Sequence, residues 1–161
     1  MESKVASLID RLQLEPHPEG GYYREIFRSG SSVKPNDERE ARSALTSIYF
    51  LLVDGEFSRW HRLQSDEVWY FVEGAPVELF QLDGGLDRLE RRVLGSATAA
   101  LDPVASVPAG SWQASRTTGS YTLVGCTVGP GFDFADFRLL ADEPQLAEQL
   151  REQYPDLAAL I

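Results

Sequence analysis

Residues 61–74 read HRLQSDEVWYFVEG, and this stretch decides the fold class. A histidine at its start is followed six residues later by a glutamate, and a glycine closes it. The segment EVWYFVEG combines aromatic and β-branched residues, which favours a β-strand that ends at the glycine. The stretch therefore predicts a strand that carries ionisable groups among large aromatic rings.

Similar short runs extend on both sides of this stretch, from Ser43 to Leu140. Glycine, proline or aspartate separates them, and no helix alternates with them. Frequent short strands of this kind predict an antiparallel sandwich or barrel. The runs are SALTSIYFLLV, EVWYFVEG, APVELFQLD, LERRVLG, ASVPAG, GSYTLVGCTVGPG and FDFADFRLL.

Helical spacing of apolar residues appears only near the two ends of the chain. Residues 3–13 and 143–152 each predict a short amphipathic helix. The apolar tail at 154–161 is expected to pack on the barrel or on a second subunit. We predict one all-β domain over residues 1–161, with a barrel core at about 20–140.

Charge and composition limit the possible partners. The formal net charge is −10 and the pI is about 4.6, so phosphate backbones and anionic lipids would be repelled. The longest apolar run, at 47–53, is far shorter than the roughly 20 residues that span a bilayer. We expect a cytoplasmic protein that binds neither nucleic acid nor membranes. The single Cys126 is expected to be a small buried residue of a strand.

Two motifs carry a resemblance to a known superfamily. The residues Gly55, His61, Glu67 and Gly74 resemble the first motif of the cupins, in which two histidines, a glutamate and flanking glycines lie on adjacent strands. The segment PAGSWQ at 108–113 resembles the second motif, a proline-glycine turn followed by a histidine. The resemblance implies a double-stranded β-helix, the jelly-roll barrel of the cupins.

A narrower resemblance extends over most of the chain. The strings HPEGGYYRE, SIYFLL, HRLQSDEVWYFVEG, VPAGSWQ and LVGCTVGPGFDFADF are similar to the cupin-five subfamily of small cupins, most of which have no assigned reaction. This resemblance implies a jelly-roll barrel, a homodimer and a cavity at the mouth of the barrel. It implies no particular substrate.

Side-chain alternation predicts which residues face that cavity. If the strand register is unbroken, one face carries His61, Leu63, Glu67, Trp69 and Phe71. Ionisable groups beside large rings are typical of the wall of a small-molecule cavity. The opposite face carries Val68, Tyr70 and Val72, so we expect a second sheet or a partner subunit to cover it.

A divalent transition metal is one interpretation of the site, although a metal-free site is favoured. The ligand positions of the motifs supply His61, Glu67 and Gln113, whereas the second histidine position is Leu63, which cannot bind a metal. Cupin metals need three or four protein ligands, and a neutral amide oxygen is a weak ligand for zinc, iron or nickel.

The favoured interpretation is acid–base chemistry without a metal, on a small polar metabolite such as a sugar derivative. His61 is the candidate base and Glu67 its orienting or acidic partner, because histidine exchanges protons near neutral pH. Tyr49, which shares a strand face with Ser47, is the candidate proton donor. Sugar-nucleotide epimerases that share the cupin barrel use a histidine base without a metal, so isomerase or epimerase chemistry follows by analogy of fold.

Two further interpretations stay open. In the first, the protein is a binding module that stacks a sugar or another metabolite on Trp69 or Trp112 without transforming it. In the second, His61 and Glu67 form a buried hydrogen-bonded pair with a structural role. The expected substrate-binding residues are Trp69, Gln113, Trp112, Phe71 and Ser47. His17 is interpreted as a turn residue, and Glu19 or Arg24 as a residue that reaches the cavity or the dimer contact. The expected core residues after the last long strand are Phe132, Phe134 and Phe137.

Overall fold

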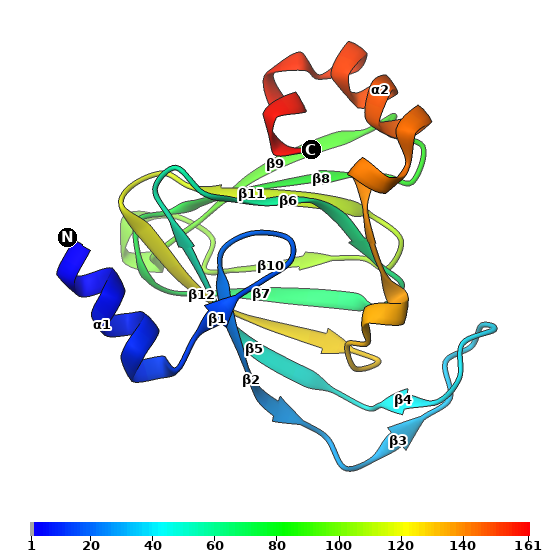
Figure 1. Ribbon diagram of the computed structural model, residues 1–161, viewed down its shortest axis with the longest axis horizontal. Helices are drawn as coiled ribbons and strands as arrows, with labels where there is room; N and C mark the ends of the chain where they lie inside the picture. The colour runs from blue at the N-terminus through cyan, green and yellow to red at the C-terminus, as the bar shows by residue number, and fades with distance from the viewer. Residues whose placement is uncertain (1) are drawn as a thin grey trace.

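Two antiparallel sheets form the barrel in the computed structural model, which describes residues 2–161 (Figure 1). The six-stranded sheet contains, in spatial order, β1 (Glu15–Pro16), β2 (Tyr22–Arg28), β5 (Thr46–Val53), β12 (Tyr121–Gly129), β7 (Asp66–Gly74) and β10 (Val104–Val107). The five-stranded sheet contains β13 (Phe137–Leu139), β6 (Phe57–Leu63), β11 (Trp112–Thr117), β8 (Val77–Leu82) and β9 (Leu89–Leu94). Strands distant in sequence, such as β5 and β12, are neighbours, which confirms the predicted jelly roll.

Helices flank the barrel where the sequence predicts them. They are α1 (Glu2–Leu12) and α2 (Pro144–Gln153), with short 3-10 helices at Ala97–Ala99, Phe134–Asp136, Leu140–Asp142 and Pro155–Leu160. A small hairpin of β3 (Ser32–Val33) and β4 (Arg42–Ser43) extends beyond the sheets (Figure 1). Within residues 2–161, no helix is long and apolar enough to cross a membrane.

The strand register differs from the one that the sequence analysis assumed. His61 lies in β6 of the five-stranded sheet, whereas Glu67 lies in β7 of the six-stranded sheet. The chain crosses from one sheet to the other at residues 64–65, so one continuous strand face does not exist. Both side chains nevertheless point into the barrel, because the inner faces of the two sheets oppose each other.

Three apolar clusters hold the fold together. Inside the barrel, the sheets pack around Phe50, Leu52, Trp69, Val77, Leu79, Leu94, Ala105, Val107, Val124 and Cys126. Cys126 is therefore buried as expected, within a strand. On the outer face of the six-stranded sheet, α1 packs over Leu14, Leu51, Tyr121 and Leu123.

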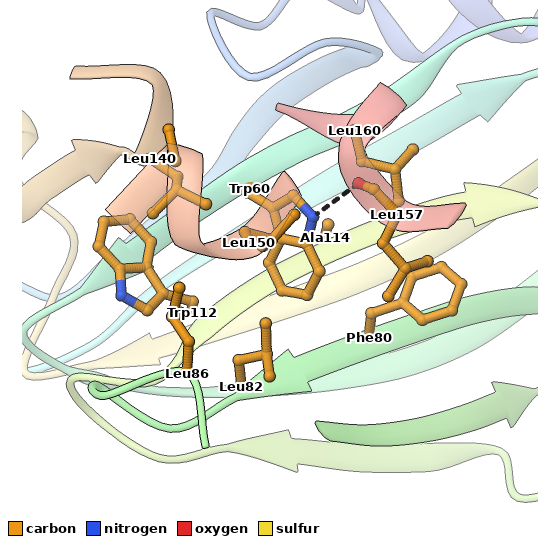
Figure 2. Close-up of a cluster of buried hydrophobic side chains, with 11 residues drawn as sticks. Trp60, Phe80, Leu82, Leu86, Trp112, Ala114, Leu140, Leu150, Leu157 and Leu160 are labelled. Carbon is orange, nitrogen blue, oxygen red and sulfur yellow. Dashed lines mark hydrogen bonds between the residues drawn. The ribbon is translucent and has the colours of Figure 1, made fainter. Parts of the chain in front are cut away.

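The third cluster lies between the outer face of the five-stranded sheet and the C-terminal segment (Figure 2). Leu150 of α2 and Leu157 of the last 3-10 helix are fully buried there. The indole Nε1 of Trp60 donates a hydrogen bond to the carbonyl of Leu157 over 3.2 Å, so the chain end is fixed by both packing and a directed bond. The apolar tail therefore packs on the barrel of its own chain.

The outward face of β7 is expected to be covered by a second sheet or a partner subunit, but in a single chain part of it is exposed. Tyr70 and Val72, on the outward face of β7, are 44% and 50% exposed, and no second sheet formed by residues 2–161 covers them. Val104 pairs with Tyr70 on the edge strand β10 and is 47% exposed. The three side chains form an uncovered apolar strip, defined here as Tyr70, Val72 and Val104.

Replacement of Leu157 by alanine tests the C-terminal cluster. Because the side chain is fully buried, we expect the free energy of unfolding to fall by about 2–5 kcal/mol. The control is Val93→Ala on the exposed side of β9, for which a change of less than about 1 kcal/mol is expected. Urea unfolding of both variants measures the difference, and equal losses would contradict the assigned packing.

Candidate functional site

A cavity of about 380 Å³ lies at one end of the barrel interior. Its deep wall comes from β5, β6, β7 and β12, and its rim comes from β1, β2 and the segment after β12. The lining residues are Glu15, His17, Glu19, Tyr23, Glu25, Arg28, Thr46, Ile48, Phe50, His61, Leu63, Glu67, Trp69, Cys126, Val128, Phe132, Asp133 and Phe134. The size is within the range of small-molecule sites in proteins.

The turn between β1 and β2 carries Glu19 into this cavity. Gly20 has φ +106°, and a Cβ there would lie 2.1 Å from the carbonyl oxygen of Phe57, so only glycine fits. The backbone N–H of Arg59 donates to the carbonyl of Glu19 over 2.7 Å and attaches the turn to β6. This close approach places the Glu19 side chain beside the inward-facing residues of β6.

Glu19 and His61 form the central polar contact of the site. The distance from Nε2 of His61 to Oε2 of Glu19 is 3.1 Å, and both side chains are buried. The other ring nitrogen, Nδ1, lies 2.7 Å from the carbonyl oxygen of Arg59. A carbonyl can only accept, so Nδ1 carries a hydrogen. When the ring is neutral, Nε2 must accept, and the shared proton then belongs to the Glu19 carboxyl group.

Burial also favours the uncharged forms of both members of this pair. It raises the pKa of Glu19 to about 8, although Ser58, which donates to Oε1 over 2.9 Å, opposes the shift. It lowers the pKa of His61, against the attraction of Glu67 and the bond to the Arg59 carbonyl. At neutral pH the pair is therefore a carboxylic acid hydrogen-bonded to a neutral imidazole.

Glu67 is held by a separate chain of hydrogen bonds. The indole Nε1 of Trp69 donates to Oε1 of Gln113 over 3.1 Å, and Nε2 of Gln113 donates to Oε2 of Glu67 over 2.6 Å. The indole fixes the orientation of the amide, since it can only donate. Burial raises the pKa of Glu67 to about 7, with a further increase from Glu19 and opposing effects of His61, Gln113 and Trp69.

His17 lines the rim of the cavity and also forms the turn that the sequence analysis assigned to it. Its Nδ1 accepts the backbone N–H of Glu19 over 3.1 Å, and its ring meets that of Tyr23 edge to face at 4.6 Å. Burial lowers the pKa of His17 to about 4, with a contribution from His61. The ring is therefore neutral at pH 7, and its 3.7 Å contact with Glu19 is not an ion pair.

Several residues expected at the site lie elsewhere. Tyr49 and Ser47 point out of the barrel, because the neighbouring Ile48 and Phe50 of β5 face inward; Tyr49 packs in the cluster under α1. Trp112 is not at the cavity mouth but is buried beneath the C-terminal segment (Figure 2). Phe71, which follows Tyr70 on β7, does not line the cavity. Gln113 does not line it either, and instead donates a hydrogen bond to Glu67.

The aromatic residues after β12 also differ from the expectation of a common core. Phe132 and Phe134 meet edge to face at 4.9 Å and line the cavity, and Phe134 is 52% exposed. Phe137 stacks on His61 with ring centroids 5.5 Å apart. Phe137 therefore covers the ring of His61, whereas Phe132 and Phe134 form part of the rim.

The metal interpretation does not fit the donor atoms of this site. Leu63 occupies one ligand position, and the Oε1 of Gln113 already accepts the indole N–H of Trp69. The described residues contain no group of three or more His, Cys, Asp or Glu side chains arranged to hold a metal ion. The amide of Gln113 turns its Nε2, not its oxygen, toward Glu67, so His61, Glu67 and Gln113 are poorly arranged to share a metal ion.

Sequence reasoning singled out the histidine of β6 and the glutamate of β7, but not the closest partner of the histidine. The sequence pattern indicates only that Glu19 or Arg24 reaches the cavity or a dimer contact, and it does not single out Tyr23, Arg28 or Thr46. The available signal was the pair of glycines in HPEGG, since a turn that excludes side chains brings its neighbours close to another strand.

Two sheets in a jelly roll, with a histidine and a glutamate facing each other across a cavity at the barrel mouth, define a cupin barrel. The chain belongs to the Cupin_5 family, described as "Cupin superfamily (DUF985)", whose model matches residues 6–140. This membership confirms the subfamily that the sequence motifs indicate. No curated protein matches the chain.

Solved structures agree with this assignment. A hypothetical protein from Leishmania major is 35% identical, with a TM-score of 0.82 over 97% of this chain and 95% of that one. A protein from Shewanella oneidensis is 38% identical, with a TM-score of 0.79 over 96% of this chain and 92% of that one. Oxalate decarboxylase from Bacillus subtilis is 16% identical, with a TM-score of 0.58 over 87% of this chain and 34% of that one, and shares the fold alone.

The protonation of Glu19 and Glu67 predicts how stability depends on pH. Folding raises both pKa values from 4.5, to about 8 and about 7, so the folded state keeps protons that the unfolded chain loses. Their stabilisation is complete below pH 4.5 and disappears as the pH rises through 7 and 8. His17 and His61 act in the opposite direction, but only below their ordinary pKa of 6.5.

We therefore expect the free energy of unfolding to decrease by about 2 kcal/mol between pH 6.5 and 8. Glu19→Gln should remove most of this decrease and Glu67→Gln a smaller part. The exposed substitution Glu56→Gln should leave it unchanged. Urea unfolding at a series of pH values provides the measurement, and a wild-type stability that is flat or rises across this interval would refute the assigned protonation.

Proposed function

We propose that the cavity binds a small polar metabolite and that its buried acids move protons on that molecule, as in an isomerase or epimerase. The observation that supports this most directly is the 3.1 Å contact between Nε2 of His61 and Oε2 of Glu19 in the cavity wall. Water-poor surroundings keep a proton on this pair near neutral pH, where a general acid is most effective.

Glu67 supplies a complementary group in the same cavity. Its pKa of about 7 leaves a substantial fraction of the carboxylate ionised at neutral pH, whereas Glu19 stays largely protonated. Two carboxyl groups whose pKa values are separated by their surroundings suit the roles of base and acid. Glu67 accepts a proton from the substrate, and the Glu19–His61 pair returns one to another position, so no oxidant or reductant is required. Glu67 then gives its proton to solvent, and the Glu19–His61 pair takes one from solvent, which restores the starting state.

Solvent-deuterium incorporation tests this proposal. The protein is incubated in deuterium oxide with separate pools of neutral sugars, sugar acids and amino sugars, and mass spectrometry detects carbon-bound deuterium. We expect exchange in one pool, and a loss of at least about 100-fold in His61→Asn, which removes the partner of Glu19. Glu56→Gln, an exposed substitution outside the cavity lining, should exchange at the wild-type rate.

The result also separates an enzyme from a binding module. If no pool acquires deuterium, the catalytic proposal fails, and ligand binding without exchange would identify a binding module. If His61→Asn loses several kcal/mol of stability and the wild type shows no exchange, the buried pair has a structural role.

We also propose that a second copy of the chain covers the apolar strip of Tyr70, Val72 and Val104. Exposed apolar side chains that adjoin on a sheet surface commonly mark protein interfaces, and a homodimer is what the family resemblance implies. The strip includes the edge strand β10, so a partner would also cover a free sheet edge.

Light scattering after size-exclusion chromatography tests the dimer. The wild type should elute as a dimer, and the double substitution Tyr70→Lys and Val72→Lys should produce a monomer, because each subunit would place charges in the interface. The double substitution Arg88→Glu and Asp87→Lys on an exposed turn should keep the dimer. A monomeric wild type, or a dimer that survives the strip substitutions, would contradict this surface.

A further inference from the structure

We propose that the cavity selects a small molecule that carries a protonated amine and rejects carboxylates and phosphates. This inference rests on the proposed function in one respect only, that the cavity is the ligand site. It adds the charge class of the ligand, which neither the fold nor the family supplies. The argument depends on which charged side chains line the cavity and on how each one is already paired.

Carboxyl groups dominate the ionisable lining. Glu19 and Glu67 lie in the deep wall, and the rim carries Glu15, Glu25 and Asp133. An anion entering this space would approach these groups closely, and like charges in poorly solvated surroundings repel strongly. The carboxyl groups would instead stabilise a cation, and those of the deep wall would lose their protons as it binds.

Arg28 is the one arginine or lysine of the lining, and it is already occupied. Its Nε and Nη2 each donate to a carboxylate oxygen of Glu25 over 2.8 Å, and Nη2 also donates to the carbonyl of Phe132 over 3.1 Å. Bidentate pairing uses the face of the guanidinium that would bind a carboxylate or phosphate. A ligand anion could then approach only the remaining nitrogen, Nη1, of a guanidinium whose charge Glu25 already balances.

The two histidines add no positive charge. Nδ1 of His17 accepts a backbone N–H, which a protonated ring could not do. His61 is surrounded by Arg59 O, Glu19 and Phe137, and burial keeps the ring neutral at pH 7. The lining therefore has no free cationic group to balance an anionic ligand.

Aromatic rings form the other part of the lining. Phe50 meets Trp69 edge to face with ring centroids 6.0 Å apart, and Tyr23 and Phe134 flank His17 at the rim at 4.6 and 6.3 Å. The faces of such rings attract ammonium groups, most strongly where water is excluded. Aromatic rings combined with carboxyl groups suit an organic cation better than a phosphate or a neutral polyol.

The net charge of the whole chain also favours a cationic ligand over an anionic one. A formal net charge of −10 attracts cations to the cavity and repels anions from it. The diphosphate of a sugar nucleotide is therefore a poor ligand. The analogy with sugar-nucleotide epimerases extends to proton transfer but not to the substrate.

A series of similar molecules with different charges tests the inference. Benzylamine, benzyl alcohol and benzoate have the same ring and nearly the same size but are cationic, neutral and anionic at pH 7. Isothermal titration calorimetry with the full-length protein measures their binding. We expect benzylamine to bind at least about tenfold more tightly than benzyl alcohol, and benzoate to bind more weakly than either.

Substitutions inside and outside the cavity lining test whether the charge selectivity arises in the cavity. Glu67→Gln should reduce benzylamine affinity by about tenfold and leave benzyl alcohol unchanged, since it removes one carboxylate and keeps a similar shape. Asp133→Asn at the exposed rim should cause a smaller loss, and it provides a second test if Glu67→Gln does not fold. Glu56→Gln changes the net charge equally but lies outside the cavity lining, so its affinities should equal those of the wild type.

Three results would overturn the inference: benzoate binding as tightly as benzylamine, no detectable benzylamine binding at about 10 mM, or the same benzylamine affinity in Glu67→Gln, Asp133→Asn and the wild type. These results do not depend on catalysis. Charge selectivity without deuterium exchange would refute the catalytic proposal alone, whereas exchange on a sugar acid without amine selectivity would refute the amine inference alone.

Discussion

The hydrogen bond between the Glu19 carboxyl group and Nε2 of His61 is the constraint on which the rest of the site depends. It exists because the Arg59 carbonyl fixes the hydrogen on Nδ1 and because the tight turn at Gly20 brings Glu19 against β6. Both partners are buried, so separating them without a replacement partner would leave an unpaired polar group, which is costly. The backbone of Arg59 thus sets both the ring tautomer and the position of the turn, and the proton shared by Glu19 and His61 leaves that pair without net charge.

The barrel can hold such a polar cavity because most of its apolar packing lies elsewhere. The C-terminal cluster and the cluster under α1 bury large side chains on the outer faces of the sheets, outside the cavity. Within the barrel, apolar side chains fill one region between the sheets and leave the other for the cavity. Buried acids lower the free energy of unfolding near neutral pH. The apolar clusters on the outer faces of the sheets offset this loss.

Sequence periodicity predicts both helices, an antiparallel β fold and a shared face for His61 and Glu67, and the resemblance to the cupins implies the jelly roll. The sequence pattern does not reveal the change of sheet at residues 64–65, because inward-facing and outward-facing side chains continue to alternate across it. It also misplaced Tyr49 and Trp112, because both faces of β5 and β11 are covered and an apolar strand with two buried faces does not reveal which one is inside. The Glu19 contact depends on how a turn folds against a distant strand, which local pattern does not encode.

The two departures from the cupin motifs have a common physical consequence. Leu63 contributes an apolar surface where the family pattern has a histidine, and Gln113 uses both ends of its amide to connect Trp69 with Glu67. A metal ion would have neutralised the carboxyl groups of the cavity and kept them ionised. Without that donor set, the negative charge of Glu19 and Glu67 must be neutralised by protons or by a ligand. Such a cavity favours a cation that enters it, so the proposed proton transfer and the proposed amine recognition would both follow from the same unbalanced charge.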